Sequence, residues 1–371
     1  MRILITNSTD IFAGGEDYVF TLAKYLLRRE HDVVVSANEG HLLLKKCAEQ
    51  EIETLPLNYT GMGRVFAVAR QLRKAIIEFD TEIIHSNANY DRTCAAIAAS
   101  FSPVPHVAGV HSAHSIQHNV THYIRNAYGT DHFIADAEAV REVLIKEDRI
   151  TAKKISVIPI GVEAMSMQEK TKARAAFREE LGVSPDTVVI GNVARLVPFK
   201  GHRVLLEAIK YVTALQRNVV FPIVGDGELM AELKQQANAL GIAQHIRWLG
   251  FRDQLDQIYP GFDIYCHSSL ELAAEAFPIA ILRALATGLP VVSTNVGGIK
   301  LMIEDGRSGF LTPPEQPRPL ATALVALISR PNERSAMGMA SFVRFQEYFN
   351  ADRMAERVEE VYEKILAERR S

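Results

Sequence analysis

The chain alternates short apolar runs with amphipathic segments, and it does so in two separate series. The apolar runs of the first series are RILIT, DVVVSA, EIIHSN, HVAGV, HFIADA and ISVIPIG. Amphipathic segments follow many of these runs, for example over 16–29 and 138–147. Parallel strands connected by helices that cover both faces of a sheet produce this alternation. The pattern therefore predicts an α/β fold with doubly wound parallel sheets.

The second series begins after a polar, charged segment over 164–180. Its apolar runs are TVVIGNVA, VVFPIVGDG, HIRWLGF, DIYCHSS and PVVSTNV. Helices are expected between and after them, over 201–216, 227–240, 253–259 and 279–287. A chain of 371 residues is long enough to bury two cores. We expect domains over 1–162 and 163–345, and a C-terminal helix within 346–371 that packs back on the first domain.

Composition narrows the class of protein. Hydrophobic residues make up 48% of the chain and charged residues 23%, as in ordinary soluble globular proteins. A net charge of −3 supplies no field that gathers nucleic acid, so no nucleic-acid partner is expected. Cys47, Cys94 and Cys266 are far apart and odd in number, which favours a reducing, cytoplasmic setting. The opening MRILIT has no leader character, and no apolar run is long enough to span a membrane, so we expect a soluble or peripherally attached protein.

Three places in the sequence suit an anion. Gly14 and Gly15 lie between a strand and a helix, where a phosphate can approach backbone N–H groups, although a flexible turn has the same pattern. Arg195 and Lys200 follow an apolar strand, and two cations there suit a diphosphate as well as they suit a solvated surface. The helix start around Phe277 is the third place. Together they favour a nucleotide diphosphate, while the absent three-glycine fingerprint disfavours a nicotinamide dehydrogenase.

Several linked segments then point to one family. They are AGGEDYVFTLAKYLLRREHDVVV, IADAEAVREVL, ISVIPIGVE, GNVARLVPFKG, VGDGEL and EAFPIAILRALATGLPVVSTNVGGIKLMIEDGRSGFLTPP. In these segments, and over nearly its whole length, the chain resembles the retaining glycosyltransferases of family 4, which have the GT-B fold of two Rossmann-like domains facing a cleft. The resemblance implies transfer of a sugar from a nucleotide-diphosphate sugar to an acceptor hydroxyl. It further implies a role in cell-surface polysaccharide or lipopolysaccharide synthesis.

The resemblance also assigns roles to residues. It implies that Arg195 and Lys200 neutralise the donor diphosphate and that Gly15, beside Gly14, lets the backbone approach it. It places Glu275, with the backbone of Ala276 and Phe277, against the donor sugar and phosphate.

The resemblance also suggests roles for residues near the donor sugar and the base. His111, in AGVHSAHS, matches a histidine near the donor sugar and the reacting centre; taken alone, it fits a structural histidine at a strand end. Gly225, Glu228 and Arg252 are weaker candidates for holding the base, and Asp226 fits turn chemistry better.

Two positions depart from the family pattern. Members carry a second Glu eight positions after the first, where it binds the ribose hydroxyls, and Arg283 stands there in this chain. A further position that is usually acidic is Leu301. A cation cannot accept the hydrogen bonds of ribose hydroxyls. Arg283 then either pairs with Glu275 or another carboxylate, or reaches a donor phosphate, or marks a binding or scaffold protein whose donor pocket has decayed.

Cofactor and partners follow from the same resemblance. No metal or cofactor is expected, since no clustered carboxylate pair stands out and the leaving group can be stabilised by cations and helix N-termini. The expected partners are a nucleotide-sugar donor and a glycan or lipid-linked acceptor. One segment has a basic face, GMGRVFAVARQLRKAII, with Arg64, Arg70, Arg73 and Lys74. It fits a core helix whose basic face is solvated better than a helix that rests on an anionic membrane. Peripheral contact with a membrane remains the alternative. A sugar-nucleotide-binding or scaffold protein and a nucleotide-sugar epimerase are the rival classes.

Overall fold

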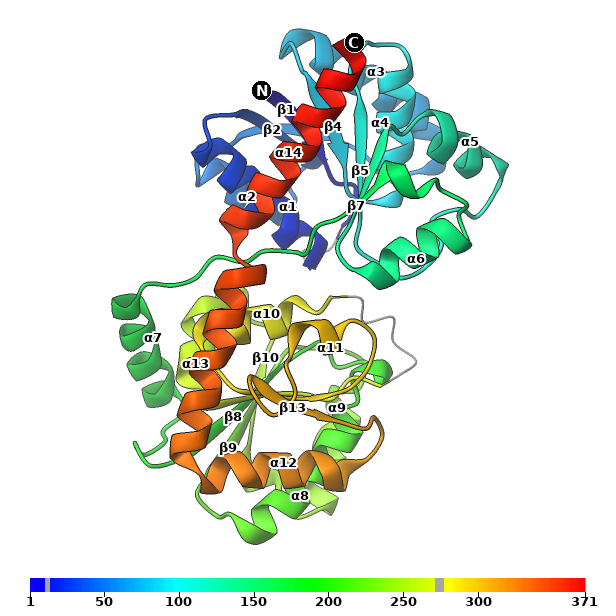
Figure 1. Ribbon diagram of the computed structural model, residues 1–371. Helices are drawn as coiled ribbons and strands as arrows, with labels where there is room; N and C mark the ends of the chain where they lie inside the picture. The colour runs from blue at the N-terminus through cyan, green and yellow to red at the C-terminus, as the bar shows by residue number, and fades with distance from the viewer. Residues whose placement is uncertain (11–13, 271–276, 371) are drawn as a thin grey trace. The chain divides into compact units, whose positions relative to one another are not determined.

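The chain folds into two compact units. The computed structural model describes residues 1–10, 14–270 and 277–370. One unit comprises Met1–Gly161 with the chain from Ala351 onward, and the other comprises Val162–Asn350 (Figure 1). The second unit therefore includes residues 346–350, which the sequence pattern places in the C-terminal segment. Within this unit the Val162 N–H donates to the Phe349 carbonyl at 3.0 Å.

The first unit is built on a seven-stranded sheet with the strand order β3-β2-β1-β4-β5-β6-β7. All neighbouring strands in it run parallel. The strands are β1 (Arg2–Thr6), β2 (Asp32–Asn38), β3 (Glu53–Leu57), β4 (Ile83–Ser86), β5 (His106–Val110), β6 (His132–Ala135) and β7 (Ile155–Val157). The order reverses between β1 and β4, which is the switch point where open α/β sheets bind ligands.

Helices cover both faces of this sheet. They are α1 (Gly14–Arg28), α2 (Leu42–Ala48), α3 (Val65–Glu78), α4 (Asn89–Ser100), α5 (Val120–Tyr128), α6 (Glu138–Lys146) and α14 (Ala351–Arg370), with the 3-10 helices η1 (Met62–Arg64) and η2 (Ala152–Lys154). The C-terminal helix α14 packs beside α1 (Figure 1). Glu359 of α14 accepts from Arg29 Nε at 2.6 Å and lies 2.8 Å from His31 Nε2.

The second unit is built on a six-stranded parallel sheet with the order β10-β9-β8-β11-β12-β13. Its strands are β8 (Val188–Val193), β9 (Val219–Val224), β10 (Ile246–Gly250), β11 (Ile264–His267), β12 (Val291–Thr294) and β13 (Gly309–Thr312). Its α-helices are α7 (Met167–Glu180), α8 (His202–Leu215), α9 (Met230–Ala239), α10 (Ile279–Thr287), α11 (Ile299–Met302), α12 (Pro317–Ser329) and α13 (Pro331–Tyr348). The core of the unit packs α8 and α12 against β8 and β9.

The predicted α/β class with two parallel sheets is confirmed, and two kinds of detail differ. The helix expected over 253–259 is wrong: the structure has the short 3-10 helices η5 (Leu255–Gln257) and η6 (Tyr259–Gly261). Pro260 lacks a backbone donor and Gly261 disfavours helix, so a longer α-helix is not stable there. The edge strands β3 and β13 were not expected. Strand β3 contains Pro56, which an edge strand tolerates.

Candidate functional site

In the first unit, three neighbouring strands end in polar residues. Asn87 follows β4, His111 follows β5 and Asp136 follows β6, and these strands are adjacent in the sheet. Because parallel strands end at the same edge, the three side chains meet there. Tyr18 of α1 adds its ring, whose centroid lies 4.3 Å from that of His111. Gly14 and Gly15, at the start of the same helix, lie one turn before Tyr18.

His111 lies between two oxygen atoms. Its Nδ1 is 3.5 Å from Asp136 Oδ2, and its Nε2 is 3.4 Å from Asn87 Oδ1. Both distances are longer than those of good hydrogen bonds. Asn87 is oriented by its own amide, because Nδ2 donates to the Thr6 carbonyl at 3.1 Å. The imidazole is therefore packed and only 14% exposed, with an acceptor near each ring nitrogen.

Gly109 of β5 provides the room for this arrangement. A Cβ atom at this position would lie 2.7 Å from Asn87 Oδ1, 3.0 Å from His111 Nε2 and 3.1 Å from His85 Nε2. Three polar atoms thus converge on the space that the missing side chain leaves.

Burial sets the protonation of the groups around His111. It is the main cause that raises the pKa of Tyr18, and the neighbouring Asp136 adds to it. Burial likewise lowers the pKa of His85 to about 3, with His111 as a further cause. His85 Nδ1 lies 2.5 Å from the hydroxyl of Tyr362 on α14. At neutral pH Tyr18 and His85 are therefore uncharged.

The same cluster holds polar atoms without a hydrogen-bond partner. Within the described part of the chain, these buried atoms include Tyr18 Oη, His85 Nε2, His111 Nδ1 and Asp136 Oδ1. Buried polar atoms are nearly always paired in folded proteins, so four such atoms in one place make this cluster a candidate functional site. Sequence reasoning found His111 and missed its neighbours. The available signal was that Asn87 and Asp136 each directly follow an apolar run.

Gly14 and Gly15 start α1 beside a polar loop. Among the residues that the structure describes, no heavy atom lies within 4 Å of a Cβ atom placed at Gly15. Glu16, which follows, is buried and accepts hydrogen bonds from Asn7 Nδ2 at 3.2 Å and from Thr9 Oγ1.

In the second unit, the structure brings Arg195 and Lys200 together after β8. The Arg195 guanidinium lies 5.8 Å from the centroid of the Phe199 ring, and Lys200 Nζ lies 5.3 Å from it. The loop backbone is tied to the end of β11, because Ser268 Oγ donates to the Lys200 carbonyl at 2.9 Å and the Leu270 N–H donates to the Phe199 carbonyl at 2.8 Å. Arg195 and Lys200 therefore both lie near the Phe199 ring, on a loop whose backbone is held by hydrogen bonds.

The turn after β9 packs against that loop. Gly225 has a φ of 137°, and a Cβ atom there would lie 2.0 Å from the Ala194 carbonyl oxygen. The Leu196 N–H donates to the Asp226 carbonyl at 2.9 Å, while Asp226 Oδ1 accepts from the Gly227 N–H at 2.7 Å. Asp226 therefore serves the turn, and Gly225 lies beside the Arg195 loop. Glu228 is exposed at the end of the turn.

Arg252 has a different neighbour. Its guanidinium forms an ion pair of 2.5 Å with Glu180 of α7, and both side chains are partly exposed. The pair lines a cavity of about 190 Å³ together with Phe177 and Asp253. That Arg252 holds the base of a nucleotide stays a prediction.

Helix α10 carries the position that departs from the family pattern. Arg283 forms an ion pair of 2.6 Å with Asp256 of η5, which agrees with the reading that Arg283 pairs with a carboxylate. Phe277 is buried and its ring lies 5.6 Å from that of Phe349. Leu301 is exposed on α11. Glu275 and Ala276 lie outside the described residues.

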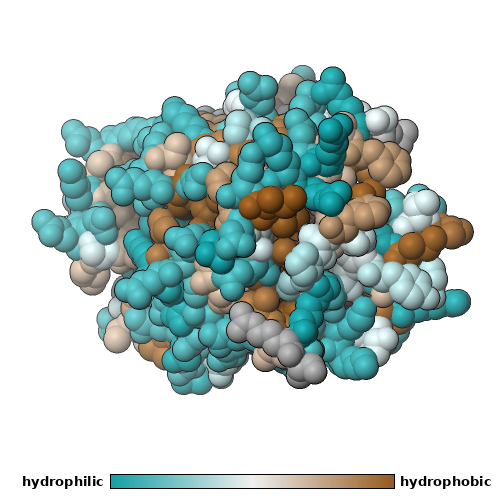
Figure 2. Space-filling model, turned by 90° about the horizontal axis from the view of Figure 1, so that it is seen from above, coloured by the Kyte–Doolittle hydropathy of each residue, from teal (hydrophilic) through white to brown (hydrophobic). Residues whose placement is uncertain are grey.

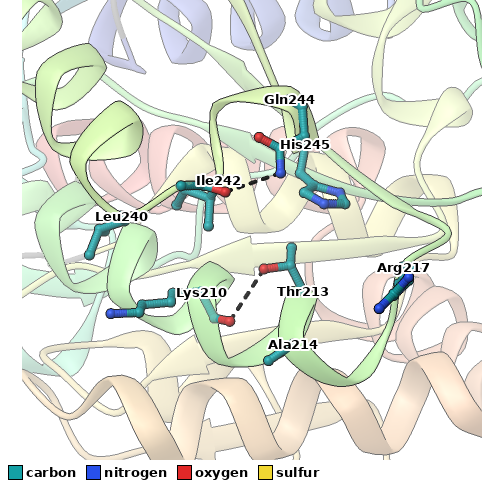
Figure 3. Close-up of a pocket in the computed structure, with 9 residues that line it drawn as sticks. Lys210, Thr213, Ala214, Arg217, Leu240, Ile242, Gln244 and His245 are labelled. Carbon is teal, nitrogen blue, oxygen red and sulfur yellow. Dashed lines mark hydrogen bonds between the residues drawn. The ribbon is translucent and has the colours of Figure 1, made fainter.

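In the second unit, a larger cavity lies near the amino ends of two strands. It has a volume of about 390 Å³ and is lined by Lys210 and Thr213 of α8, Arg217 before β9, and His245 before β10, among others (Figure 3). Because it adjoins the amino ends of β9 and β10, it is separate from the site formed by the loops after β8 and β9.

Two structural features are absent from the described part of the chain. No three His, Cys, Asp or Glu side chains there are grouped so that they could hold a metal ion. None of its helices combines the length and the apolar character needed to cross a membrane. Cys47, Cys94 and Cys266 are buried and free.

Two parallel-sheet α/β units with candidate ligand residues at the carboxyl ends of their strands define the GT-B fold. Solved structures agree. A glycosyltransferase from Rickettsia africae superposes with a TM-score of 0.85, at 21% identity over 98% of both chains. HepE of Anabaena in complex with UDP-glucose superposes with a TM-score of 0.82, at 24% identity over 98% of this chain and 100% of that chain. At these identities the likeness establishes the fold.

The sequence then places the chain within this class. Residues 12–164 match the family described as Glycosyltransferase Family 4, and residues 173–342 match the one described as Glycosyl transferases group 1. The chain belongs to the family 4, group 1 glycosyltransferases.

Curated relatives are similar over part of their length. The UDP-Gal:alpha-D-GlcNAc-diphosphoundecaprenol alpha-1,3-galactosyltransferase of Escherichia coli is 30% identical over 246 residues, which are 62% of either protein. A D-inositol 3-phosphate glycosyltransferase of Corynebacterium urealyticum is 34% identical over 196 residues, which are 50% of this chain and 45% of the relative. The chain thus spans less than two thirds of the length of these relatives.

Proposed function

We propose that the protein transfers a sugar from a uridine-diphosphate sugar to an acceptor hydroxyl, with retention of anomeric configuration and without a metal ion. The observation that carries the proposal is the pair of cations, Arg195 and Lys200, held at the carboxyl end of β8 by the anchored backbone around Phe199. The uridine donor is supported by the E. coli relative, named for UDP-Gal, and by the complex of HepE with UDP-glucose.

The mechanism that we propose is electrostatic. Negative charge develops on the leaving diphosphate, and fixed positive groups stabilise that charge without reorganising during the reaction. Arg195 offers a planar fork to phosphate oxygens, and Lys200 offers a point charge. His111, in the first unit, contacts the donor sugar near the reacting carbon. Retention of configuration rests on the family resemblance.

For the acceptor, we propose a glycan or a lipid-linked sugar of cell-surface polysaccharide or lipopolysaccharide synthesis, used at the inner face of the cell membrane. The name of the E. coli relative specifies a lipid diphosphate acceptor. The structure adds a surface that suits a membrane: Phe66 and Ile77 of α3 are 77% and 68% exposed, and Arg70, Arg73 and Lys74 lie on the same outer face. The opposite face of α3 is buried, as expected for a core helix with a solvated basic face. Contact of the outer face with a membrane is part of this proposal.

Calorimetric titration with UDP, GDP, ADP and CMP, in the presence of a chelator, tests the donor site. We expect selective binding of UDP, and about tenfold weaker binding by Lys200→Ala, which loses one charged contact. Lys210→Ala is the matched control, because it removes the same charge from α8 beside the separate cavity.

The reaction itself is tested by incubating the protein with UDP-sugars and candidate acceptors and determining the anomeric configuration of the product by NMR. An α-linked product from an α-linked donor supports the proposal. Binding of UDP without transfer to any acceptor indicates a sugar-nucleotide-binding or scaffold protein instead, and a changed sugar without an acceptor indicates an epimerase.

A further inference from the structure

The ring of His111 is surrounded by groups whose position the proposed function does not by itself explain. Asp136 is 2% exposed and directs Oδ2 at His111 Nδ1 from the neighbouring strand end. Its other oxygen, Oδ1, has no hydrogen-bond partner in the described part of the chain. A buried carboxylate with an unpartnered oxygen is costly, so its position beside an imidazole calls for a specific role.

The protonation of the ring follows from its two neighbours. If the proton were on Nε2 alone, the lone pair of Nδ1 would face the carboxylate of Asp136 in a buried setting, and two acceptors would repel each other. A proton on Nδ1 replaces that repulsion with a charge-assisted contact. The lone pair of Nε2 then faces Asn87 Oδ1, 3.4 Å away, but this amide oxygen carries no net charge and repels the lone pair less than a carboxylate would. The 3.5 Å separation is long for a hydrogen bond, and such contacts in sites without ligand commonly shorten when the ligand binds.

The remaining contacts restrict how the ring can turn. Tyr18 packs on one side of it, at 4.3 Å between centroids. Gly109 and Asn87 lie at its Nε2 edge. A ring that is confined in this way and held through Nδ1 keeps Nε2 in one direction.

We propose that Asp136 is a positioning residue: it keeps a proton on Nδ1 of His111 and so presents Nε2 in a fixed direction at the carboxyl edge of the first sheet. For catalysis this inference rests on the proposed function, in which His111 contacts the donor sugar. In this proposal Asp136 acts through the ring of His111. Its effect on sugar transfer passes through the direction of the imidazole, and a misdirected catalytic contact costs about 10²-fold in rate.

The first test reads the tautomer directly. The ¹⁵N shifts of the histidine rings are recorded on the full-length protein at neutral pH, and the His111 signals are assigned as those missing from His111→Gln. We expect a protonated Nδ1 in the wild type and a shift toward the Nε2-protonated tautomer in Asp136→Asn. Glu138→Gln is the matched control, since it removes the same charge two residues away at a partly exposed position, and it should leave the His111 signals unchanged.

A wild-type His111 with an unprotonated Nδ1 overturns the inference without any variant, so the test does not depend on Asp136→Asn folding well. Unchanged His111 signals in a folded Asp136→Asn overturn it too.

The second test is kinetic. In Asp136→Asn we expect kcat for sugar transfer to fall by about 10²-fold while the Kd for UDP stays the same, because the group that is misdirected acts on the sugar and not on the diphosphate. Equal kcat in the variant and in Glu138→Gln contradicts the inference. A wild type that transfers no sugar refutes the proposed function instead, and the tautomer then decides the inference alone.

Discussion

Single residues decide whether the loop with the two cations can form. Gly201, which follows Lys200, has a φ of 67°, and a Cβ atom there would lie 1.9 Å from the Ser268 carbonyl oxygen. An L side chain would meet both backbone strain and a clash with main chain that cannot move aside easily. The position of Lys200 thus depends on a residue that itself carries no chemistry.

The substitution Gly201→Ala is expected to lower the free energy of unfolding by more than about 1–2 kcal/mol and to weaken UDP binding, since the clash adds to the left-handed conformational cost. Denaturant unfolding and calorimetric titration measure the two effects.

Gly241→Ala provides the control for this prediction. Gly241 has a similar φ of 71°, but no heavy atom of the described residues lies within 4 Å of a Cβ atom placed there, so the conformational cost applies without the clash. Equal destabilisation by the two substitutions would show that the contact with Ser268 does not matter.

The ion pair of Arg283 and Asp256 lies at the surface of the second unit. Asp256 is 62% exposed, so solvent screens the pair. In a double-mutant cycle with Arg283→Ala and Asp256→Ala, we expect a coupling of about 0.2–1 kcal/mol in unfolding free energy.

The charge reversal Arg283→Glu adds a functional readout to that cycle. It places a carboxylate beside Asp256, and repulsion between the two carboxylates should keep the new side chain from binding the ribose as the family's Glu does, so we expect no gain in UDP binding over Arg283→Ala. Stronger binding or higher activity in Arg283→Glu would argue against any specific role for this arginine.

Among the elements, α3 has one buried face and one exposed face. Val68, Leu72 and Ile76 are buried in the first core. On the outer side, Phe101, which directly follows α4, is 67% exposed, and the centroid of its ring lies 6.0 Å from the Arg73 guanidinium. The surface in Figure 2 is hydrophilic over most of its area, with hydrophobic side chains in small groups between the polar ones. Apolar side chains beside cations are the combination that binds anionic lipid surfaces.

The triple substitution Arg70→Gln, Arg73→Gln and Lys74→Gln should reduce binding to vesicles of phosphatidylglycerol and phosphatidylcholine by about 3 kcal/mol, at about 1 kcal/mol for each cation. Cosedimentation measures this binding, and added salt should reduce wild-type binding as well. The same charge change at Lys210, Arg217 and Lys234, in the second unit, is the control. Equal losses in both triple variants would point to net charge instead of this surface.

At the scale of the whole molecule, buried histidines link stability to pH. Burial is the main cause that lowers the pKa of four histidines. The pKa of His85 falls to about 3, and those of His106, His132 and His202 fall to about 4. In the unfolded chain a histidine binds its proton near pH 6.5. Between pH 6.5 and 4 the unfolded state therefore holds more protons than the folded state, and stability falls as the pH falls.

We expect the urea midpoint of unfolding to be clearly lower at pH 5 than at pH 7.5, with a loss of up to about 1.4 kcal/mol per pH unit for each histidine. His202→Asn should make the second unit less sensitive to pH than the wild type. Because the chain has two units, each needs its own spectroscopic probe. A midpoint that does not change between the two pH values contradicts the prediction.

The sequence alone determined the class of fold and part of the site. Buried parallel strands must be apolar runs, so most strands could be predicted, whereas β3, with Pro56 at an edge, could not. Arg195 and Lys200 could be predicted because they lie in the loop that follows an apolar strand, and the resemblance to family 4 implied a role for His111.

Only the tertiary structure decided which side chains surround His111. Tyr18 comes from α1, His85 and Asn87 come from β4 and its end, and Asp136 comes from the end of β6. The order of β4, β5 and β6 in the sheet brings the strand residues together around His111. It likewise decided that Arg283 pairs with Asp256, which lies 27 positions away in the chain. The physical reason is that local patterns report which face of an element is buried, whereas strand order and long-range pairing depend on how all elements pack at once.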